Sequence, residues 1–442
     1  MTDMTTGPVR RHLFTYALPL IAGNFLQLTY NAVDSILVGK GAGLDALSAV
    51  SVSNPVSALL VLFVSGLGIG GSVWISRFFG AGDKEKVKRS FSTMMISGTV
   101  LSFIVLFFGL LFSQQILTLM KVPDEIMDLS LVYLRLLFVG NLFTFQYNLL
   151  SQALRAIGDS KAPLKFITVS SLMNACLDAV FIFGFHLSVF GAALATVLSE
   201  AASAILCAIY IYRKVPVLSL HRKDWCFDRV LFNGISSSGI LTALQQSCQP
   251  IGKLCIQSVI NTQGIDVIAA FNAACRIDDY GRIPTQTNAA GIMTCVSQNL
   301  GAGKKDRVRD SLKQGLFLIL IYCPFAAAAM FFFRRPLLTL FAPNDGGEEM
   351  IQIGVSYLAV KAFMIVFPAF TNSIQGFFRG LNHMTITLVS TILQISLRTL
   401  FVFLLVPKIG IIGEAWASAI GWAAMIVYEY GYYFLRVRKR LL

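Results

Sequence analysis

The stretch LFTYALPLIAGNFLQLTYNAVDSILVG, residues 13–39, is long enough to cross a lipid bilayer as one tilted helix. It contains one proline, Pro19, and one acid, Asp34, but no basic residue. A carboxylate inside a membrane is costly, and proteins keep one where it faces an internal cavity, binds a cation or exchanges a proton. The stretch therefore predicts a membrane-spanning helix in which Asp34 has a function.

The whole chain has the composition of a polytopic membrane protein. It is 55% hydrophobic and only 13% charged, and its mean hydropathy is +0.69. Long apolar runs, in place of the short alternating segments of a membrane β-barrel, predict that the spans are α-helices. Runs bounded by Gly, Pro and charge give about twelve spans, at residues 13–39, 47–78, 90–117, 129–155, 163–187, 189–213, 231–262, 267–299, 311–333, 350–378, 384–407 and 411–435.

The net charge of +13 is explained by membrane topology and not by nucleic-acid binding. Most of the 36 Lys and Arg residues fall in alternate loops and at both chain ends, whereas the opposite loops carry Lys40, Lys121, Arg334, Arg335 and Lys408. Because basic loops stay in the cytoplasm, we expect a cell-membrane protein with both termini in the cytoplasm.

The chain contains an internal duplication. The stretch ISRFFGAGDKEKVKRSF from Ile75 matches VSQNLGAGKKDRVRDSL from Val296, 221 residues later, and the VFGAALAT run from Val189 echoes IIGEAWAS from Ile411. An even number of spans separates the copies, so the halves have the same orientation and form a parallel repeat. We expect two six-helix bundles, an N-terminal lobe at 1–213 with the cation site and a C-terminal lobe at 231–442, joined by a cytoplasmic linker at 214–230.

A candidate cation or proton site lies in the fifth and sixth spans. Asn174 is four residues before Asp178, so amide and carboxylate share one helical face, and Thr196 adds a hydroxyl if the next span is an antiparallel neighbour. Such oxygens suit a hard cation, which makes sodium possible as well as a proton. The positions 220 residues later are Gln394 and Arg398, so the carboxylate belongs to the first half alone.

Polar residues around Asp34 are candidates for the wall of a substrate cavity. Gln27, Tyr30 and Asn31 fit such a wall or ordinary helix contacts. Pro19 removes one backbone hydrogen bond and should bend the first span, as a hinge or as a common feature of inert membrane helices.

The second half carries a separate polar cluster inside its spans. Its members are Lys253, Arg276, Asp278, Asp279 and Arg282. We expect ion pairs among these residues, and we expect Lys361 and Arg398 to pair with the same eighth-span acids, although snorkelling and lining of the cleft are alternatives.

Together the proline-containing first span with LTYNAVDSILVG, the repeated GAG turns, QNLGAG at Gln298 and MNACLDAVFIFG resemble the multidrug and toxin extrusion (MATE) transporters over essentially the whole chain. Within that family the chain resembles the DinF-like bacterial branch. The resemblance implies that Asp34 is the central cation or proton site and that Pro19 bends in response to its protonation. The resemblance further implies that Asn174, Asp178 and Thr196 form a polar cluster with Asp34. It implies cavity neighbours at Gln27, Tyr30 and Tyr133.

These observations predict a secondary antiporter that exports organic, cationic or amphipathic drugs in exchange for protons or sodium by alternating access, and that confers antibiotic resistance. We expect a monomer in the lipid bilayer, without a cofactor, without a nucleic-acid partner and without catalytic residues. The alternative is a lipid-linked oligosaccharide flippase of similar architecture, for which basic residues in the cleft would bind a pyrophosphate.

Other functions fit less well. The GxGD motif at Gly80–Asp83 is typical of an intramembrane protease, but Asp83 lies among basic residues outside a span. GLGIGG at 66–71 matches a dinucleotide fingerprint by letter only and is better explained by close helix packing. An intramembrane hydrolase built on Asp34 and Asp178, or a channel, remains a further alternative.

Overall fold

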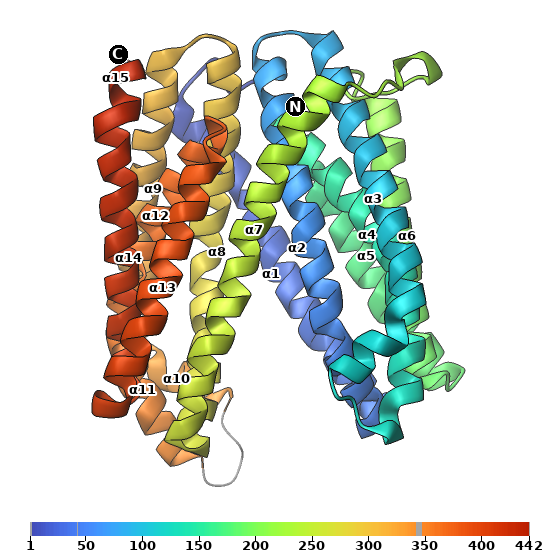
Figure 1. The fold of residues 1–442 in the computed structure, drawn as a ribbon, viewed down its shortest axis with the longest axis vertical. Coiled ribbons are helices and arrows are strands. Elements are labelled where there is room, and N and C mark those ends of the chain that lie inside the picture. The colour runs from blue at the N-terminus through green and yellow to red at the C-terminus, as the bar shows by residue number, and fades with distance from the viewer. Residues whose placement is uncertain (1, 42, 342–346, 442) are drawn as a thin grey trace. The chain divides into compact units, whose positions relative to one another are not determined.

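The computed structural model describes residues 2–41, 43–341 and 347–441, except for the side chains at 31–36, 38–40, 44, 47, 440 and 441. Every regular element in this part of the chain is a helix (Figure 1). The predicted all-α fold class is thus confirmed. The chain forms two compact units, of which the first comprises Met1–Asp3 and Leu18–Ala243, and the second Met4–Ala17 and Leu244–Leu442.

Unit 1 is built from the first half of the chain. Its helices are the later part of α1 (Val9–Gly41), α2 (Leu44–Gly80), α3 (Lys84–Leu119), α4 (Asp124–Ala156), α5 (Lys161–Asp178), the π-helical η1 (Ala179–Gly184), α6 (Ser188–Lys214), the short η2 (Arg222–Asp224) and the first part of α7 (Arg229–Ile260). Helix α4 packs against α2, α3 and α6, and a buried apolar cluster that includes Phe145, Leu149 and Leu154 fills the space between them.

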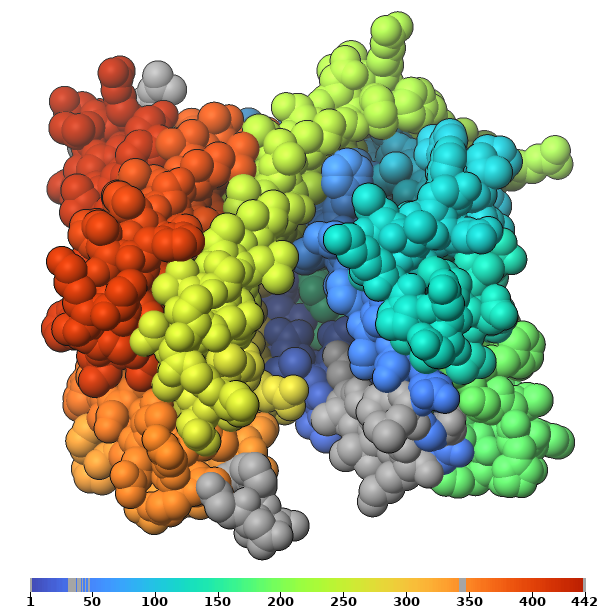
Figure 2. Space-filling model, turned by 60° about the horizontal axis from the view of Figure 1, so that its bottom comes forward, coloured from blue at the N-terminus to red at the C-terminus, as the bar shows by residue number. Residues whose placement is uncertain are grey.

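Unit 2 repeats this arrangement with the second half. Its elements are the start of α1, the end of α7, η3 (Asn261–Gln263), α8 (Ile265–Gly301), α9 (Lys305–Phe332), α10 (Arg334–Thr339), α11 (Glu348–Met364), α12 (Val366–Gly380), α13 (Met384–Ile409), α14 (Ile412–Tyr432), the π-helical η4 (Tyr433–Val437) and α15 (Arg438–Leu441). The second part of α7 lies against α13 (Figure 2). Between these helices Gln245 Nε2 donates to Thr391 Oγ1 at 3.0 Å.

The units exchange short segments, which the sequence did not predict. Residues 4–17 belong to unit 2, where the Met4 N–H donates to Gln298 Oε1 at 3.0 Å and the hydroxyls of Tyr16 and Thr294 lie 3.1 Å apart. Residues 229–243, which were assigned to the second lobe and its linker, belong to unit 1. The compact units therefore differ from the contiguous lobes drawn from the sequence.

The duplicated GAG motif forms the same turn in both units. Gly82 and Gly303 have φ of 74° and 71°, a left-handed conformation that glycine adopts without strain. In each copy the alanine before that glycine caps the preceding helix, and the residue after it donates its N–H back into the last helical turn. The repeat seen in the sequence is thus present in the backbone, and the motif has a structural role.

The described helices account for the predicted spans. Seven are long and apolar enough to cross a membrane, and the bent pair α11 and α12 makes an eighth. The helices α1, α7, α8 and α14 lie at the four remaining predicted spans, 13–39, 231–262, 267–299 and 411–435.

The tenth predicted span, 350–378, is broken where a single helix was expected. Helices α11 and α12 meet at Ile365 with a bend of 41°. Pro368 has no N–H to donate to the carbonyl of Met364, and its ring crowds that carbonyl, so the break falls at this turn.

Candidate functional site

The α5 and α6 residues of the predicted cation or proton site lie together in unit 1. The side chains of Asp178 and Asn174 are 0% and 1% exposed. Both project from α5 with the expected four-residue spacing, and Thr196 lies on α6, which packs against α5. The structure therefore brings the three residues together.

Hydrogen bonds join this group to the first helix. An Asn174 amide that turns its nitrogen toward Asp178 satisfies both of its ends, because the nitrogen lies 2.7 Å from Asp178 Oδ2 and 3.2 Å from the Tyr30 hydroxyl. Its oxygen then accepts from the Thr196 N–H at 3.2 Å. The opposite orientation leaves the amide nitrogen a single contact of 3.4 Å to Thr196 Oγ1. We therefore assign the orientation in which Asn174 donates to the Asp178 carboxylate.

The helix changes form directly after Asp178. Residues Ala179–Gly184 make a π-helix, in which the wider turn rotates the following side chains relative to an α-helix. Its last turns are closed by the N–H groups of Phe185 and Leu187, which donate to Val180 O and Phe181 O. Such π-helical insertions occur often at functional sites, and the apolar sequence gave no signal for this one.

The other first-lobe candidates have different environments. Gln27 is exposed. Pro19 is buried, and α1 continues through it without a break. Tyr133 packs in an apolar cluster with Ala49 and Ile182, among others. The roles proposed for these residues remain predictions.

Asp34 and Asn31 lie outside the described side chains. The backbone position of Asp34 on α1 follows Tyr30 by one helical turn. The placement of its carboxylate therefore remains a prediction from the sequence.

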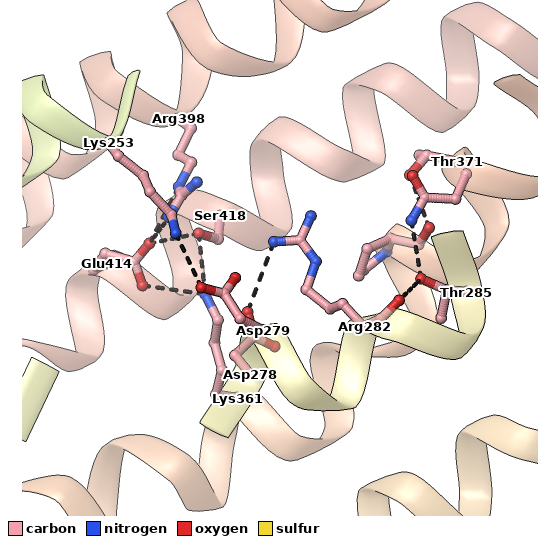
Figure 3. Close-up of polar contacts among 12 residues, drawn as sticks. Lys253, Asp278, Asp279, Arg282, Thr285, Lys361, Thr371, Arg398, Glu414 and Ser418 are labelled. Atoms are coloured by element: carbon pink, nitrogen blue, oxygen red, sulfur yellow. Dashed lines mark hydrogen bonds and ion pairs between the residues drawn. The ribbon is translucent and has the colours of Figure 1, made fainter. Parts of the chain in front are cut away.

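In unit 2 the acid at the centre of the charge cluster is Glu414, which the sequence analysis had not selected as a partner. Glu414 on α14 is 0% exposed and meets two cations from other helices (Figure 3). Arg398 on α13 donates to Oε1 through Nη2 at 2.5 Å and Nε at 3.1 Å, while Lys361 Nζ on α11 lies 3.3 Å from Oε2. Ser418 donates to Oε1 at 2.7 Å, and the Tyr357 hydroxyl donates to Oε2.

This arrangement corrects one expectation. Lys361 and Arg398 were expected to pair with the acids of the eighth span, but both bind Glu414. The signal was available, since Glu414 is an acid at the beginning of an otherwise apolar last span. What the sequence could not give was the packing that brings α11, α13 and α14 together.

The predicted second-lobe cluster forms in part. Lys253 Nζ on α7 lies 3.3 Å from Asp279 Oδ2, and Arg282 Nη1 lies 3.9 Å from Asp278 Oδ2, one helical turn away on α8. Arg276 is exposed and belongs to none of the ion pairs found among the described residues. The cluster is thus two ion pairs beside the Glu414 group (Figure 3).

Among the described residues, His, Cys, Asp and Glu form no group of three or more that could hold a metal ion. A sodium ion would instead need the neutral oxygens near Asp178. In the assigned orientation Asn174 presents nitrogen to that carboxylate, so a shared sodium ligand set would require the amide to turn over.

Comparison with known proteins identifies the family. The sequence model of the MatE family matches residues 19–180 and 242–404. The chain belongs to the MatE family. One match falls in each half of the chain, which agrees with the internal repeat and with the two compact units.

Individual MatE relatives are distant but cover most of the chain. It is similar to the probable multidrug resistance protein YpnP of Bacillus subtilis, with 28% identity over 89% of this chain and 87% of the relative. It is also similar to the multidrug export protein MepA of Staphylococcus aureus, with 26% identity over 94% of this chain and 91% of MepA.

Solved structures establish the MatE fold along the full length. A crystal structure of MATE in complex with MaL6 superposes with a TM-score of 0.91 at 23% identity and covers 99% of this chain and 98% of that one. An outward-facing multidrug resistance MATE family transporter gives the same TM-score and identity, with coverage of 99% and 97%.

Proposed function

We propose that this MatE protein is a secondary antiporter of the cell membrane that exports organic, cationic or amphipathic drugs in exchange for protons or sodium. Family membership and the full-length likeness to YpnP and MepA support multidrug export. Exchange would proceed by alternating access, in which the ion and the substrate are bound and released at different steps of one conformational cycle.

The observation that carries the ion-coupled part is the buried Asp178 carboxylate with its Asn174 and Tyr30 neighbours. Inside the membrane a carboxylate that accepts a hydrogen bond from a neutral amide is suited to exchange its charge with an incoming ion. The donor face that Asn174 turns to Asp178 favours a proton over sodium as the ion bound there. Asp34, one turn after Tyr30 on α1, would be the second carboxylate of the coupled pair.

Three finer features belong to the same proposal. We place the chain in the DinF-like branch, because Asp34, Asn174, Asp178 and Thr196 match its motif. The basic alternate loops favour cytoplasmic termini. A monomer is the simplest state, since each polypeptide already supplies both halves of the repeat.

The flippase alternative required free basic groups for a pyrophosphate. Lys361 and Arg398 share Glu414, Lys253 is paired with Asp279, and Arg282 lies near Asp278. Each of these four basic groups already faces an acid, although Lys361 and Arg398 share one carboxylate, and this engagement favours drug antiport over pyrophosphate binding.

Ion release by purified protein tests the proposal. On addition of ethidium, the wild type should release protons into a weakly buffered solution containing a pH dye, and should release no bound ²²Na⁺. Asp178→Asn and Asp34→Asn should each abolish most of this release, whereas Glu125→Gln, which removes an exposed acid at the start of α4, should leave it unchanged. Undiminished release in Asp178→Asn would refute this site, and release of sodium alone would refute the proton.

A further inference from the structure

A second buried acid lies outside the site described above. Glu429, near the end of α14, is 0% exposed. Its Oε1 lies 2.6 Å from the Ser390 hydroxyl of α13, and its Oε2 has no hydrogen-bond partner among the described residues. A permanently charged carboxylate in such a place would leave one of its two oxygens without a hydrogen bond, which is unfavourable inside a membrane.

Ser390 can satisfy Glu429 in either protonation state. Its Oγ lies 2.6 Å from Glu429 Oε1 and 3.0 Å from the Thr387 carbonyl, but it carries a single hydrogen. When Glu429 is ionised, Ser390 donates to its carboxylate. When Glu429 is protonated, its O–H donates to Ser390 Oγ, and Ser390 turns its hydrogen to Thr387 O. One hydroxyl rotation therefore accompanies uptake or loss of one proton.

One charged side chain acts on Glu429 within the described residues. Arg379 on α12 interacts electrostatically with the acid, but its Nη2 donates to Gln245 Oε1 at 3.0 Å, and its Nε has no partner within the described part of the chain. From α12, Gln375 also lies close to Glu429, and on α14 the neighbouring titratable group is Tyr430. The positive charge that acts on the acid among the described residues is thus hydrogen-bonded to Gln245 and not to Glu429.

The helix pair itself is the counterpart of the one that holds Asp178. Ser390, Gln394 and Arg398 on α13 follow Ser170, Asn174 and Asp178 on α5 by 220 residues, and α14 corresponds to α6. Gln394 is buried, and both atoms of its amide have no partner in the described structure, as is also true of Glu429 Oε2. The second lobe thus contains, between α13 and α14, buried polar atoms that have no hydrogen-bond partner in the described structure.

We propose that Glu429 is a second proton-binding site, in which the carboxylate takes a proton from hydronium and holds it against Ser390. The site is distinct from the Asp178 group and does not depend on the drug-export proposal. It lies near the last residues of α12 and α14 and the first turns of α13, so it would exchange protons at that end of the helices.

Infrared titration of the purified full-length protein in nanodiscs tests this site without substrate or ion gradient, so its failure is distinguishable from failure of the antiport. Protein labelled with ¹³C-glutamate should gain an isotope-shifted carbonyl band of a protonated, water-shielded carboxylic acid as the pH falls. Glu429→Gln should lose that band, whereas Glu349→Gln, which removes an exposed glutamate in the first turn of α11, should keep it.

Ser390→Ala provides the second variant, which tests the site even if Glu429→Gln does not fold. It removes the hydrogen bond to the acid, so the same band should move to a higher wavenumber and appear at a different pH. The proposal is overturned if the band persists in Glu429→Gln, if it is present at every pH, or if Ser390→Ala leaves it unmoved.

Discussion

Among the described residues, Glu414 is the acid that pairs with both Lys361 and Arg398. Removing Glu414 and removing one of these cations should therefore change the free energy of unfolding by different amounts. Glu414→Gln preserves the side-chain shape but leaves Lys361 and Arg398, which are 5% and 12% exposed at their side chains, without a negative partner. Removing one partner from a buried pair costs about 3–5 kcal/mol, mainly because an uncompensated charge remains. We therefore expect Glu414→Gln to lower the free energy of unfolding by about 3–5 kcal/mol.

Lys361→Met should be far milder, although it also breaks an ion pair. It removes a bond of about 1.5–3 kcal/mol to a charged group. It also removes the cost of burying the ammonium, and it leaves Glu414 with the two shorter Arg398 contacts as a balanced pair. The net change should be about 1 kcal/mol or less.

The sharpest consequence concerns the double variant. Glu414→Gln alone leaves two buried cations, but Glu414→Gln with Lys361→Met leaves one, so the second substitution should restore stability. Unfolding by SDS in mixed micelles, followed by tryptophan fluorescence, measures all three variants. If Lys361→Met alone costs as much as Glu414→Gln, or if the double variant is less stable than Glu414→Gln, the charge-balance argument is wrong.

Three further outcomes test the packing, the linker and the topology. A Cβ on Gly70 would lie 2.6 Å from a backbone carbonyl of α7, so Gly70→Ala should destabilise by about 1–3 kcal/mol in thermal unfolding, whereas Gly184→Ala, with nothing within 4 Å, should not. The Lys88 side chain and a backbone N–H hold the pKa of Asp224 below its usual value of 3.8, so docking of the 214–230 segment should be complete above that pH and weaken as the pH falls through the lowered pKa. Limited proteolysis should cut the 214–230 segment faster at low pH. At neutral pH, Asp224→Ala should be cut as fast as the wild type at low pH. With exposed Cys226 as the sole cysteine, an impermeant maleimide should label everted vesicles and spare intact cells, and the reverse would contradict cytoplasmic termini.

The sequence predicted features that depend on spacing along one helix or on repetition. The apolar runs predicted the helices, and the spacing from Asn174 to Asp178 predicted a shared face because a helical turn takes 3.6 residues. The GAG turns were predictable because two copies need the same left-handed glycine. The sequence also predicted that Lys253 pairs with an acid of the eighth span, and Asp279 is that acid.

Features that depend on contacts between distant helices were out of reach. The amide of Asn174 meets Tyr30 from a helix more than a hundred residues earlier, and no spacing rule specifies that contact. The π-helical turns after Asp178 replace an α-helix in a sequence with ordinary helical composition. The bend at Ile365 was closer to prediction, since Pro368 was visible, but proline is tolerated in many membrane helices without a break.

The internal repeat connects the two polar groups. Aligning VFGAALAT with IIGEAWAS places Ser418 at the position of Thr196 and Glu414 at the position of Ala192, while Arg398 stands where α5 has Asp178. In the second copy a buried arginine has replaced the acid, and an arginine cannot lose its charge, so it requires a permanent anion nearby. Glu414 supplies that anion from the position where the first copy has Ala192, one turn before the hydroxyl-bearing position that the two copies share. The first copy needs no such anion and keeps alanine there. On the proposal made above, the same helix pair exchanges an ion at Asp178 in one lobe and forms a fixed charge cluster around Glu414 in the other.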